Sequence, residues 1–262
     1  MCNDKLRVAL VQLDLVDSSI NLNMDKIRKT VLPLGKNKPD IIVIPELAIE
    51  GYNFNYVKQM SETDFNHIIM FYSDLAKEIG TMIVTGFVEK KHDRYYDAAL
   101  CVDKTGKIID IYRKFHLWGK ESDFFTPGNQ YSLLEVNGWK IGIGICADAG
   151  FPEFSRSLAL LGADILVYIS AWVKPYTDSW LLMCQARACE NQMYVIGVNR
   201  IGFASGAECC GNSVAIDPAG CIISNLSERE DFSLIDLELS KVRQKRQEIP
   251  WLKMRKPSLY RL

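Results

Sequence analysis

The sequence has little histidine, no long apolar run and no strong excess of either charge. Its three histidines, His67, His92 and His116, are not four residues apart as on a zinc-binding helix, and no C-x-x-C pair occurs. We therefore expect no metal and no cofactor. No apolar run reaches membrane-spanning length, and the formal net charge of -1 gives no electrostatic reason to bind nucleic acid or an anionic membrane surface.

Other familiar signals are also missing. The N-terminal residues lack the pattern of a secretory leader, because the polar start runs directly into a strand-like segment. The eight cysteines are scattered rather than regularly spaced, which is typical of reduced thiols, so we expect a cytoplasmic protein. No Pro-, Gly- or Ser-rich linker, low-complexity tract or repeat divides the chain. With 48% hydrophobic and 24% charged residues it can bury a large core, and we expect one domain over residues 1–262.

Strand-length apolar runs alternate with amphipathic helices, which is the pattern of a layered α/β domain. Ser61 with Asp64 is typical of a capping box that starts a helix, and Gly80 marks the end of that helix. Asn137-Gly138 between two apolar runs predicts a β-hairpin, and Pro152 predicts the start of a later helix. The main strands are expected at residues 6–13, 41–45, 82–88, 95–102, 139–145, 165–169 and 194–198.

Three apolar runs end in side chains that together can hydrolyse an amide. Cys146 follows the strand-like run Trp139–Ile145, and a thiol at such a break can act as a nucleophile. Glu46, at the end of another run, would accept the thiol proton and later activate the water that cleaves the thioester. Lys114 would stabilise the anionic tetrahedral intermediate, with the backbone N–H of Ala147 as a second donor, and its charge would favour the thiolate.

The sequence around these residues resembles the three signature blocks of the nitrilase, or carbon-nitrogen hydrolase, superfamily, in the same order. The blocks are Pro45-Glu46-Leu47 with Gly51-Tyr52, Tyr112-Arg113-Lys114-Phe115-His116-Leu117, and Ile145-Cys146 with Asp148, Phe151, Pro152 and Glu153. The resemblance covers nearly the whole chain. It implies an α/β fold of the carbon-nitrogen hydrolase type, the αββα sandwich, commonly dimerised into an αββα-αββα stack. We therefore expect a homodimer or higher homo-oligomer, although the aromatic C-terminal tail is expected by default to pack back on its own chain.

The resemblance also assigns roles outside the triad. In this family a second glutamate usually follows the lysine by a few residues, and Glu121 matches that position best. It would hold Lys114 in place and relay a proton. Tyr52, from the loop after Glu46, and Trp172, after a later strand, are the expected substrate-binding walls of the pocket together with the loop of the nucleophile, although either ring can be simple core packing.

Several segments resemble omega-amidases and related members that remove a terminal amide from small keto or carboxylic acids. These segments are residues 168–172, 185–192 and 199–202. The block after the nucleophile departs from that branch, because Ala147 stands where a tyrosine is common and Gly150 where an arginine is common. The loss of the ring and the guanidinium should enlarge the pocket and remove a carboxylate partner, unless Lys120, Lys174 or Arg200 supplies the charge.

We therefore expect an amidase that hydrolyses the C–N bond of a small-molecule amide through a cysteine thioester and releases ammonia. An N-carbamoyl amidohydrolase or a nitrilase would use the same residues, so these alternatives stay open. A Cys-His dyad of Cys146 with His116 is a further alternative, which the absence of a papain-like signature disfavours. A catalytically inactive binding or scaffold homologue is the alternative from a different class, and the intact Glu-Lys-Glu-Cys set argues against it.

Overall fold

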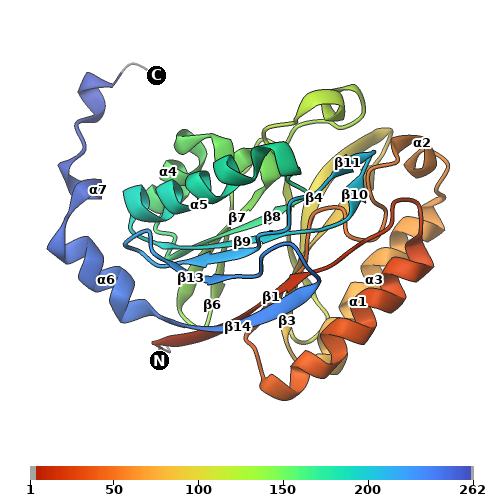
Figure 1. Ribbon diagram of the computed structural model, residues 1–262, viewed down its shortest axis with the longest axis horizontal. Coiled ribbons are helices and arrows are strands. Elements are labelled where there is room, and N and C mark those ends of the chain that lie inside the picture. The colour runs from red at the N-terminus through yellow and green to blue at the C-terminus, as the bar shows by residue number, and fades with distance from the viewer. Residues whose placement is uncertain (1–3, 261–262) are drawn as a thin grey trace.

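Two six-stranded sheets lie face to face at the centre of the protein, and two helices cover the outer side of each sheet (Figure 1). The computed structural model describes residues 4–260. In sheet order, the first sheet consists of β14 (Asp231–Glu238), β1 (Lys5–Gln12), β2 (Ile41–Val43), β3 (Met82–Lys91), β4 (Arg94–Val102) and β5 (Ile108–Arg113). The second consists of β13 (Ile222–Asn225), β12 (Val214–Ile216), β9 (Tyr194–Asn199), β8 (Ile165–Ser170), β7 (Trp139–Ile145) and β6 (Ser132–Val136).

The helices complete the expected αββα sandwich. Helices α1 (Ile20–Leu34) and α3 (Glu62–Ile79) cover the first sheet, and α4 (Pro152–Leu161) and α5 (Thr177–Asn191) cover the second. The smaller elements are α2 (Phe54–Val57), α6 (Leu239–Glu248), α7 (Trp251–Met254), the strand pair β10 (Phe203–Ala204) and β11 (Ala207–Glu208), and the 3-10 turns η1 (Gly35–Asn37), η2 (Gly119–Asp123), η3 (Cys146–Gly150), η4 (Lys174–Tyr176) and η5 (Pro257–Leu259).

The core explains why the central strands have near-continuous apolar sequences. Along β1, Leu6, Val8 and Leu10 belong to the cluster between the two sheets, whereas Ala9 and Val11 belong to the cluster under α1 and α3. Both faces of these strands are therefore covered, as is usual for parallel strands. The β1-β2-β3 group is parallel, and so is the β7-β8-β9 group.

The local signals of the sequence are confirmed at most of the element boundaries. Ser61 and Asp64 form a reciprocal capping box at the start of α3, and Gly80 ends that helix with a φ of +66°. Asn137-Gly138 connects β6 and β7 as a hairpin, and Pro152 is the first residue of α4. The strand predicted at residues 41–45 is shorter, because β2 ends at Val43 and the chain turns sharply after it.

The C-terminal segment extends away from the body of the protein (Figure 1). Leu252 packs against the core, but Trp251, Met254 and Leu259 are 41%, 64% and 71% exposed. The default expectation that this tail packs back on its own chain is therefore wrong for most of its large apolar side chains. Within residues 4–260, none of the helices combines the length and the apolarity needed to cross a membrane.

Candidate active site

The candidate site lies where strands of both sheets end at the same edge. Glu46 follows β2, Cys146 follows β7 and Ala171 follows β8. These strands are parallel to their neighbours, so their carboxyl ends meet. Lys114 follows β5, which runs in the same direction as β3 because both intervening pairings are antiparallel. The sandwich therefore brings four distant segments of the chain to one place.

Glu46 lies in a tight turn and is fully buried. Its Oε1 accepts a hydrogen bond from Lys114 Nζ at 2.7 Å, and its Oε2 accepts one from the backbone N–H of Ala171 at 2.8 Å. Gly86 on β3 leaves room for this turn, because a Cβ at that position would lie 2.4 Å from the Glu46 Cα. Both carboxyl oxygens thus have a donor, one from each sheet.

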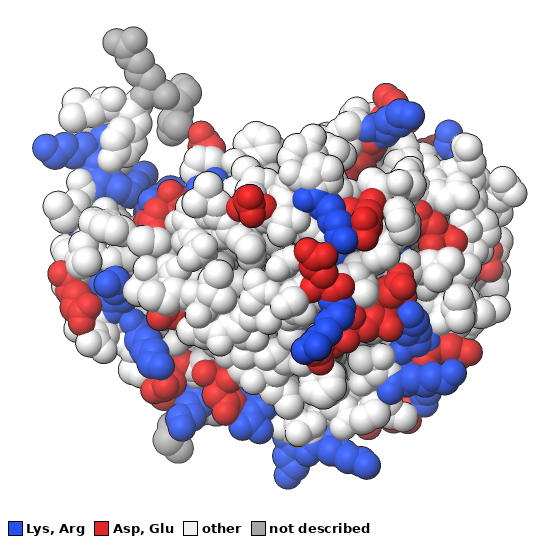
Figure 2. Space-filling model, viewed as in Figure 1, with Lys and Arg blue, Asp and Glu red and all other residues white. Residues whose placement is uncertain are grey.

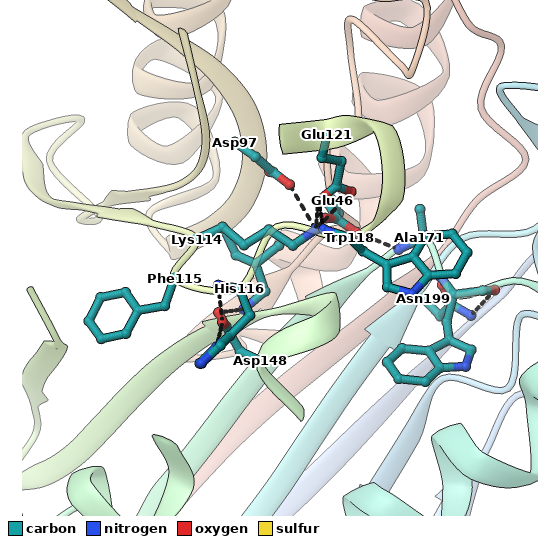
Figure 3. Close-up of polar contacts among 12 residues, drawn as sticks. Glu46, Asp97, Lys114, Phe115, His116, Trp118, Glu121, Asp148, Ala171 and Asn199 are labelled. Carbon is teal, nitrogen blue, oxygen red and sulfur yellow. Dashed lines mark hydrogen bonds and ion pairs between the residues drawn. The ribbon is translucent and has the colours of Figure 1, made fainter. Parts of the chain in front are cut away.

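The ammonium of Lys114 is surrounded by three carboxyl groups (Figure 3). Its Nζ lies 2.7 Å from Glu46, 2.8 Å from Glu121 and 3.1 Å from Asp97, and the lysine side chain is fully buried. The backbone N–H of Lys114 also donates to the carbonyl of Asp97 at 2.9 Å, and its own carbonyl accepts from Gly128 at 2.8 Å. These contacts fix one positive charge at the end of β5.

Glu121 reaches this cluster from η2. Its Oε2 also accepts a hydrogen bond from the backbone N–H of Trp118 at 2.8 Å. Asp97 on β4 was not predicted. Its only sequence signal is an acidic residue inside an otherwise apolar strand, a place where a carboxyl group needs a partner.

The three carboxyl groups are also of a kind that can hold a metal ion. Ligand atoms of Glu46, Asp97 and Glu121 all lie within 4.8 Å of one another. The position that a cation would occupy between them is filled by Lys114 Nζ, which is within 3.1 Å of each group. In this structure the three carboxyl groups therefore surround the ammonium of Lys114.

Cys146 starts η3 with a φ of +42°, which is left-handed backbone and uncommon for a residue with a Cβ. Such a conformation costs on the order of 1–3 kcal/mol and persists only where neighbouring contacts hold it. Asp148 provides one of them, because its Oδ2 accepts the backbone N–H of Ile145 at 2.9 Å and the hydroxyl of Tyr112 at 2.6 Å. The sharp turn presents the thiol at the end of β7.

The protein around Cys146 favours the neutral thiol. Desolvation and the negative charges of Glu46 and Glu121 raise the pKa of Cys146 well above its usual range, and the charge of Lys114 does not outweigh them. Lys114 does favour the thiolate, as expected, but burial and the two carboxylates outweigh its charge in the resting site. The same cluster treats Glu46 differently: burial opposes its ionisation, but the Lys114 charge and hydrogen bonds from Asp97, Lys114 and Tyr52 lower the pKa of Glu46.

His116 is joined to Asp148 (Figure 3). Its Nδ1 lies 2.7 Å from Asp148 Oδ1, which also accepts the His116 backbone N–H at 3.1 Å, and its ring stacks on Phe151 with centroids 3.6 Å apart. Asp148 therefore links the loop of Lys114 to the turn of Cys146. These contacts give His116 a role in joining two loops.

Cys146 lines a pocket of ≈ 400 Å³ whose walls are mostly apolar. Ala147, Gly150 and Trp172 line it as well, and none of the described residues around it is charged. The sequence did not predict its other large walls, which are Trp118, Phe151, Tyr176 and Met183. Tyr52 lines a second hollow of ≈ 280 Å³ that shares Cys146 with the first, and its hydroxyl also reaches Glu46.

Gly150 faces open space, since a Cβ built on it would have no heavy atom within 4 Å. Arg200 and Lys174 do not replace the missing arginine. Arg200 is buried against Leu15 and Phe203 backbone carbonyls, and Lys174 pairs with Glu208 and Glu228. Of the three cations considered, Lys120 alone lines the second hollow.

The turn of the nucleophile is supported from behind by α5. Arg187 Nε donates to the carbonyl of Ala149 at 3.0 Å, and Arg187 Nη1 pairs with Glu190 at 2.8 Å with i, i+3 spacing. Arg187 thus fixes the backbone of η3 without reaching the pocket itself.

Comparisons with known proteins agree with this fold. The family model "Carbon-nitrogen hydrolase" matches residues 7–247. The hydrolase in the agr operon of Staphylococcus lugdunensis is 35% identical over 227 residues, which are 85% of this chain and 97% of that protein. An omega-amidase of Saccharomyces cerevisiae is 28% identical over 279 residues, which are 98% and 96%. A solved amidase structure from Nesterenkonia sp. AN1 has a TM-score of 0.88 at 24% identity, over 97% of this chain and 95% of that one.

The fold and these relatives define a hydrolase that acts on non-peptide C–N bonds. The chain belongs to the carbon-nitrogen hydrolase family. A mechanism through a cysteine thioester is general to this family.

Proposed function

We propose that the protein is an amidase that hydrolyses an uncharged small-molecule amide and releases ammonia. Cys146 is the nucleophile, Glu46 the general base, Lys114 the electrostatic stabiliser and Glu121 the residue that positions Lys114. The observation that carries the proposal is the buried Glu46-Lys114-Glu121 cluster, which acts electrostatically on Cys146 at the wall of an apolar pocket. The omega-amidase among the relatives supports the reaction class.

In the proposed reaction, Glu46 accepts the Cys146 proton as the sulfur attacks the amide carbon. The oxygen of the tetrahedral intermediate becomes negative, and the Lys114 charge and the Ala147 N–H stabilise it. Lys114 acts through its charge because carboxyl groups already accept hydrogen bonds from its ammonium. Glu46 then gives the proton to the leaving nitrogen, ammonia departs and a thioester remains.

Water completes the cycle. Glu46 accepts a proton from the attacking water, the second tetrahedral intermediate collapses, and the sulfur leaves and is protonated again. The products are a carboxylic acid and the free thiol. One base therefore serves both halves of the reaction, which requires that Glu46 is ionised whenever the site is empty.

The pocket supports an uncharged acyl group as the preferred substrate. Its walls are aromatic and aliphatic, and the open space at Gly150 is the place of the guanidinium that is common in the omega-amidase-like branch. A substrate carboxylate there would lose its water without gaining a cation, unless Lys120 reaches it. We therefore propose that the enzyme favours neutral amides over dicarboxylic acid monoamides.

This proposal is tested by ammonia release from butyramide, phenylacetamide, succinamate, an N-carbamoyl amino acid and a nitrile of similar size. The expected result is turnover of the two neutral amides with a kcat/KM at least as high as that for succinamate. A strong preference for succinamate would restore the omega-amidase interpretation. Turnover of the ureide or the nitrile alone would replace the amidase by one of the other two activities.

We also propose a homodimer or higher homo-oligomer formed through the face that carries α4, α5 and the C-terminal tail. Large apolar side chains are exposed there, among them Leu161 (52%), Leu182 (68%) and Met254 (64%). Figure 2 shows the sandwich from its side, with α4, α5 and the tail toward the upper left and several charged side chains to the right of centre. A second copy would remove this apolar surface from water.

A reducing compartment fits the cysteines. All seven cysteines in the described part of the chain are free, and four of them are buried. We therefore propose a cytoplasmic location, in which none of these thiols needs a disulfide partner.

A further inference from the structure

One ammonium and three carboxyl groups are buried together at the end of β5. Lys114 has contacts of 2.7–3.1 Å with Glu46, Asp97 and Glu121, and all four residues are buried. If every carboxyl were ionised, the cluster would carry an excess of two negative charges. Like charges at this separation in a low-dielectric site do not all ionise, so at least one carboxyl is expected to keep a proton.

The hydrogen-bond donors around each carboxyl group indicate which of the three groups keeps the proton most favourably. Glu46 and Glu121 each accept a backbone N–H in addition to the ammonium, from Ala171 and Trp118 at 2.8 Å. Asp97 accepts only from Lys114, through Oδ2 at 3.1 Å, the longest of the three contacts. Its buried Oδ1 accepts no hydrogen bond. Ionised Asp97 would thus be the least satisfied of the three carboxylates.

We propose that Asp97 is held as a neutral carboxylic acid that donates a hydrogen bond to Glu46, and that it is a positioning residue which keeps Glu46 ionised beside Cys146. This inference rests on the proposed role of Glu46 as the base. Asp97 does not touch the reacting thiol; it acts through Glu46 and through the placement of Lys114. The proton stays on Asp97 during turnover.

The charges that face Asp97 also favour its neutral form. They are Glu46 from the turn after β2, Lys114 from the end of β5 and Glu121 from η2. Burial and the negative charge of Glu46 raise the pKa of Asp97 well above its usual range, despite Lys114. The hydrogen bond between the two carboxyls raises the pKa of Asp97 and lowers that of Glu46, as expected when Asp97 is the donor.

The first test needs no substrate. A protonated carboxylic acid has an infrared C=O stretch that is distinct from the bands of a carboxylate and shifts on exchange into D2O. Burial raises the pKa of Glu50 to about 7, so the spectrum is recorded above about pH 8, where Glu50 is ionised. We expect the band in the wild-type protein under these conditions and its loss in Asp97→Asn. A wild-type spectrum with no such band, or one whose band survives in Asp97→Asn and disappears in Glu121→Gln, overturns the proposal.

The second test uses the rate at which iodoacetamide alkylates Cys146, followed by peptide mass over a range of pH. Asp97→Asn keeps a neutral donor of similar shape, so we expect a rate within about threefold of wild type and an unchanged acid limb. Asp97→Ala removes the donor, and the rate should fall about tenfold while the acid limb moves up by about one pH unit. Glu121→Gln is the matched control. Its alkylation rate should fall further below that of wild type than the rate of Asp97→Asn.

Two results of the alkylation test contradict the proposal. If Asp97→Asn is as slow as Asp97→Ala, the negative charge of Asp97 is required. If Asp97→Ala is as fast as wild type at every pH, Asp97 does not act through Glu46. Absence of amide turnover in wild type would contradict the proposed function, and the infrared result would still show whether Asp97 is protonated.

Discussion

At the scale of the residue, Cys146 rests as a neutral thiol near Glu46. Burial and the carboxylates raise its pKa, while the pKa of Glu46 is lowered by its hydrogen bonds and by Lys114. In the proposed mechanism, the base Glu46 is therefore ionised while the nucleophile Cys146 is still protonated. Proton transfer and attack on the substrate then belong to the same step, and the low-pH limit of the reaction reports Glu46.

We predict that kcat/KM for butyramide stays constant through mildly acidic pH and falls only below the ordinary range of a glutamate pKa. The physical reason is the lowered pKa of Glu46, whose ionised form is needed and is lost as the pH falls through that value. The measurement is the pH-rate profile of wild type and of His116→Ala, which should have the same acid limb. A fall near the pKa of histidine that His116→Ala abolishes would support the Cys-His dyad instead.

Removal of the Lys114 charge should damage stability as well as activity. In Lys114→Met, three buried carboxyl groups lose their common cation, and breaking such a buried set costs about 3–5 kcal/mol. We predict a lower midpoint of urea unfolding together with the loss of turnover. The control is Lys120→Met, because Lys120 is exposed and is not the common cation of the buried carboxyl groups. Equal unfolding midpoints for the two variants would show that the cluster does not depend on Lys114.

At the scale of the element, the site consists of strand ends that are joined by hydrogen bonds from the short loops after them. Asp148 in η3 accepts hydrogen bonds from Tyr112 at the end of β5 and from Ile145 at the end of β7, so it joins the two sheets. Arg187 on α5 holds the same turn through the Ala149 carbonyl. Ala147 and Gly150 of the same turn both line the pocket, so we propose that this turn also contributes to substrate specificity.

Gly150→Arg should restore recognition of a carboxylate. The backbone of Gly150 is not left-handed and a Cβ there meets nothing within 4 Å, so the turn can accept the larger residue. One charge-assisted bidentate contact is worth about 2 kcal/mol, or roughly thirtyfold in preference. We predict a shift of about that size in the ratio of kcat/KM for succinamate to that for butyramide. Gly150→Met, a long neutral side chain, is the control, and an equal shift in both variants would contradict the explanation.

At the scale of the whole molecule, the strands, the helices and the turns between them follow from the sequence, because turn residues and apolar runs act locally. The stacking of the two sheets follows only from the resemblance to a family. Asp97 and Trp118 do not follow from the sequence. Asp97 gains its partners only when β4 lies between β3 and β5. Trp118 becomes a pocket wall only because the fold places it beside Tyr176 of η4 and Met183 of α5. The exposed tail is a further case, since its apolar residues alone do not tell whether they pack on the same chain or on another.

The exposed apolar face predicts self-association. Leu182→Glu places a charge on α5 where a second copy would bury it, and we expect the variant to have a lower molar mass in light scattering at the same concentration. Leu22→Glu on α1, a leucine 53% exposed on the opposite layer, is the matched control and should leave the mass unchanged. A wild-type mass equal to one chain, about 29.7 kDa, would contradict the proposed dimer.

In the proposed reaction, Cys146 forms a thioester with the acyl group of an amide while Glu46 moves the protons. The most direct measurement is the mass of the protein quenched in acid during turnover of butyramide, followed by digestion. We predict a mass increase equal to the acyl group on the peptide that contains Cys146, and neither adduct nor ammonia release in Cys146→Ala. An adduct on another cysteine, or unchanged turnover in Cys146→Ala with the fold intact, would contradict the account.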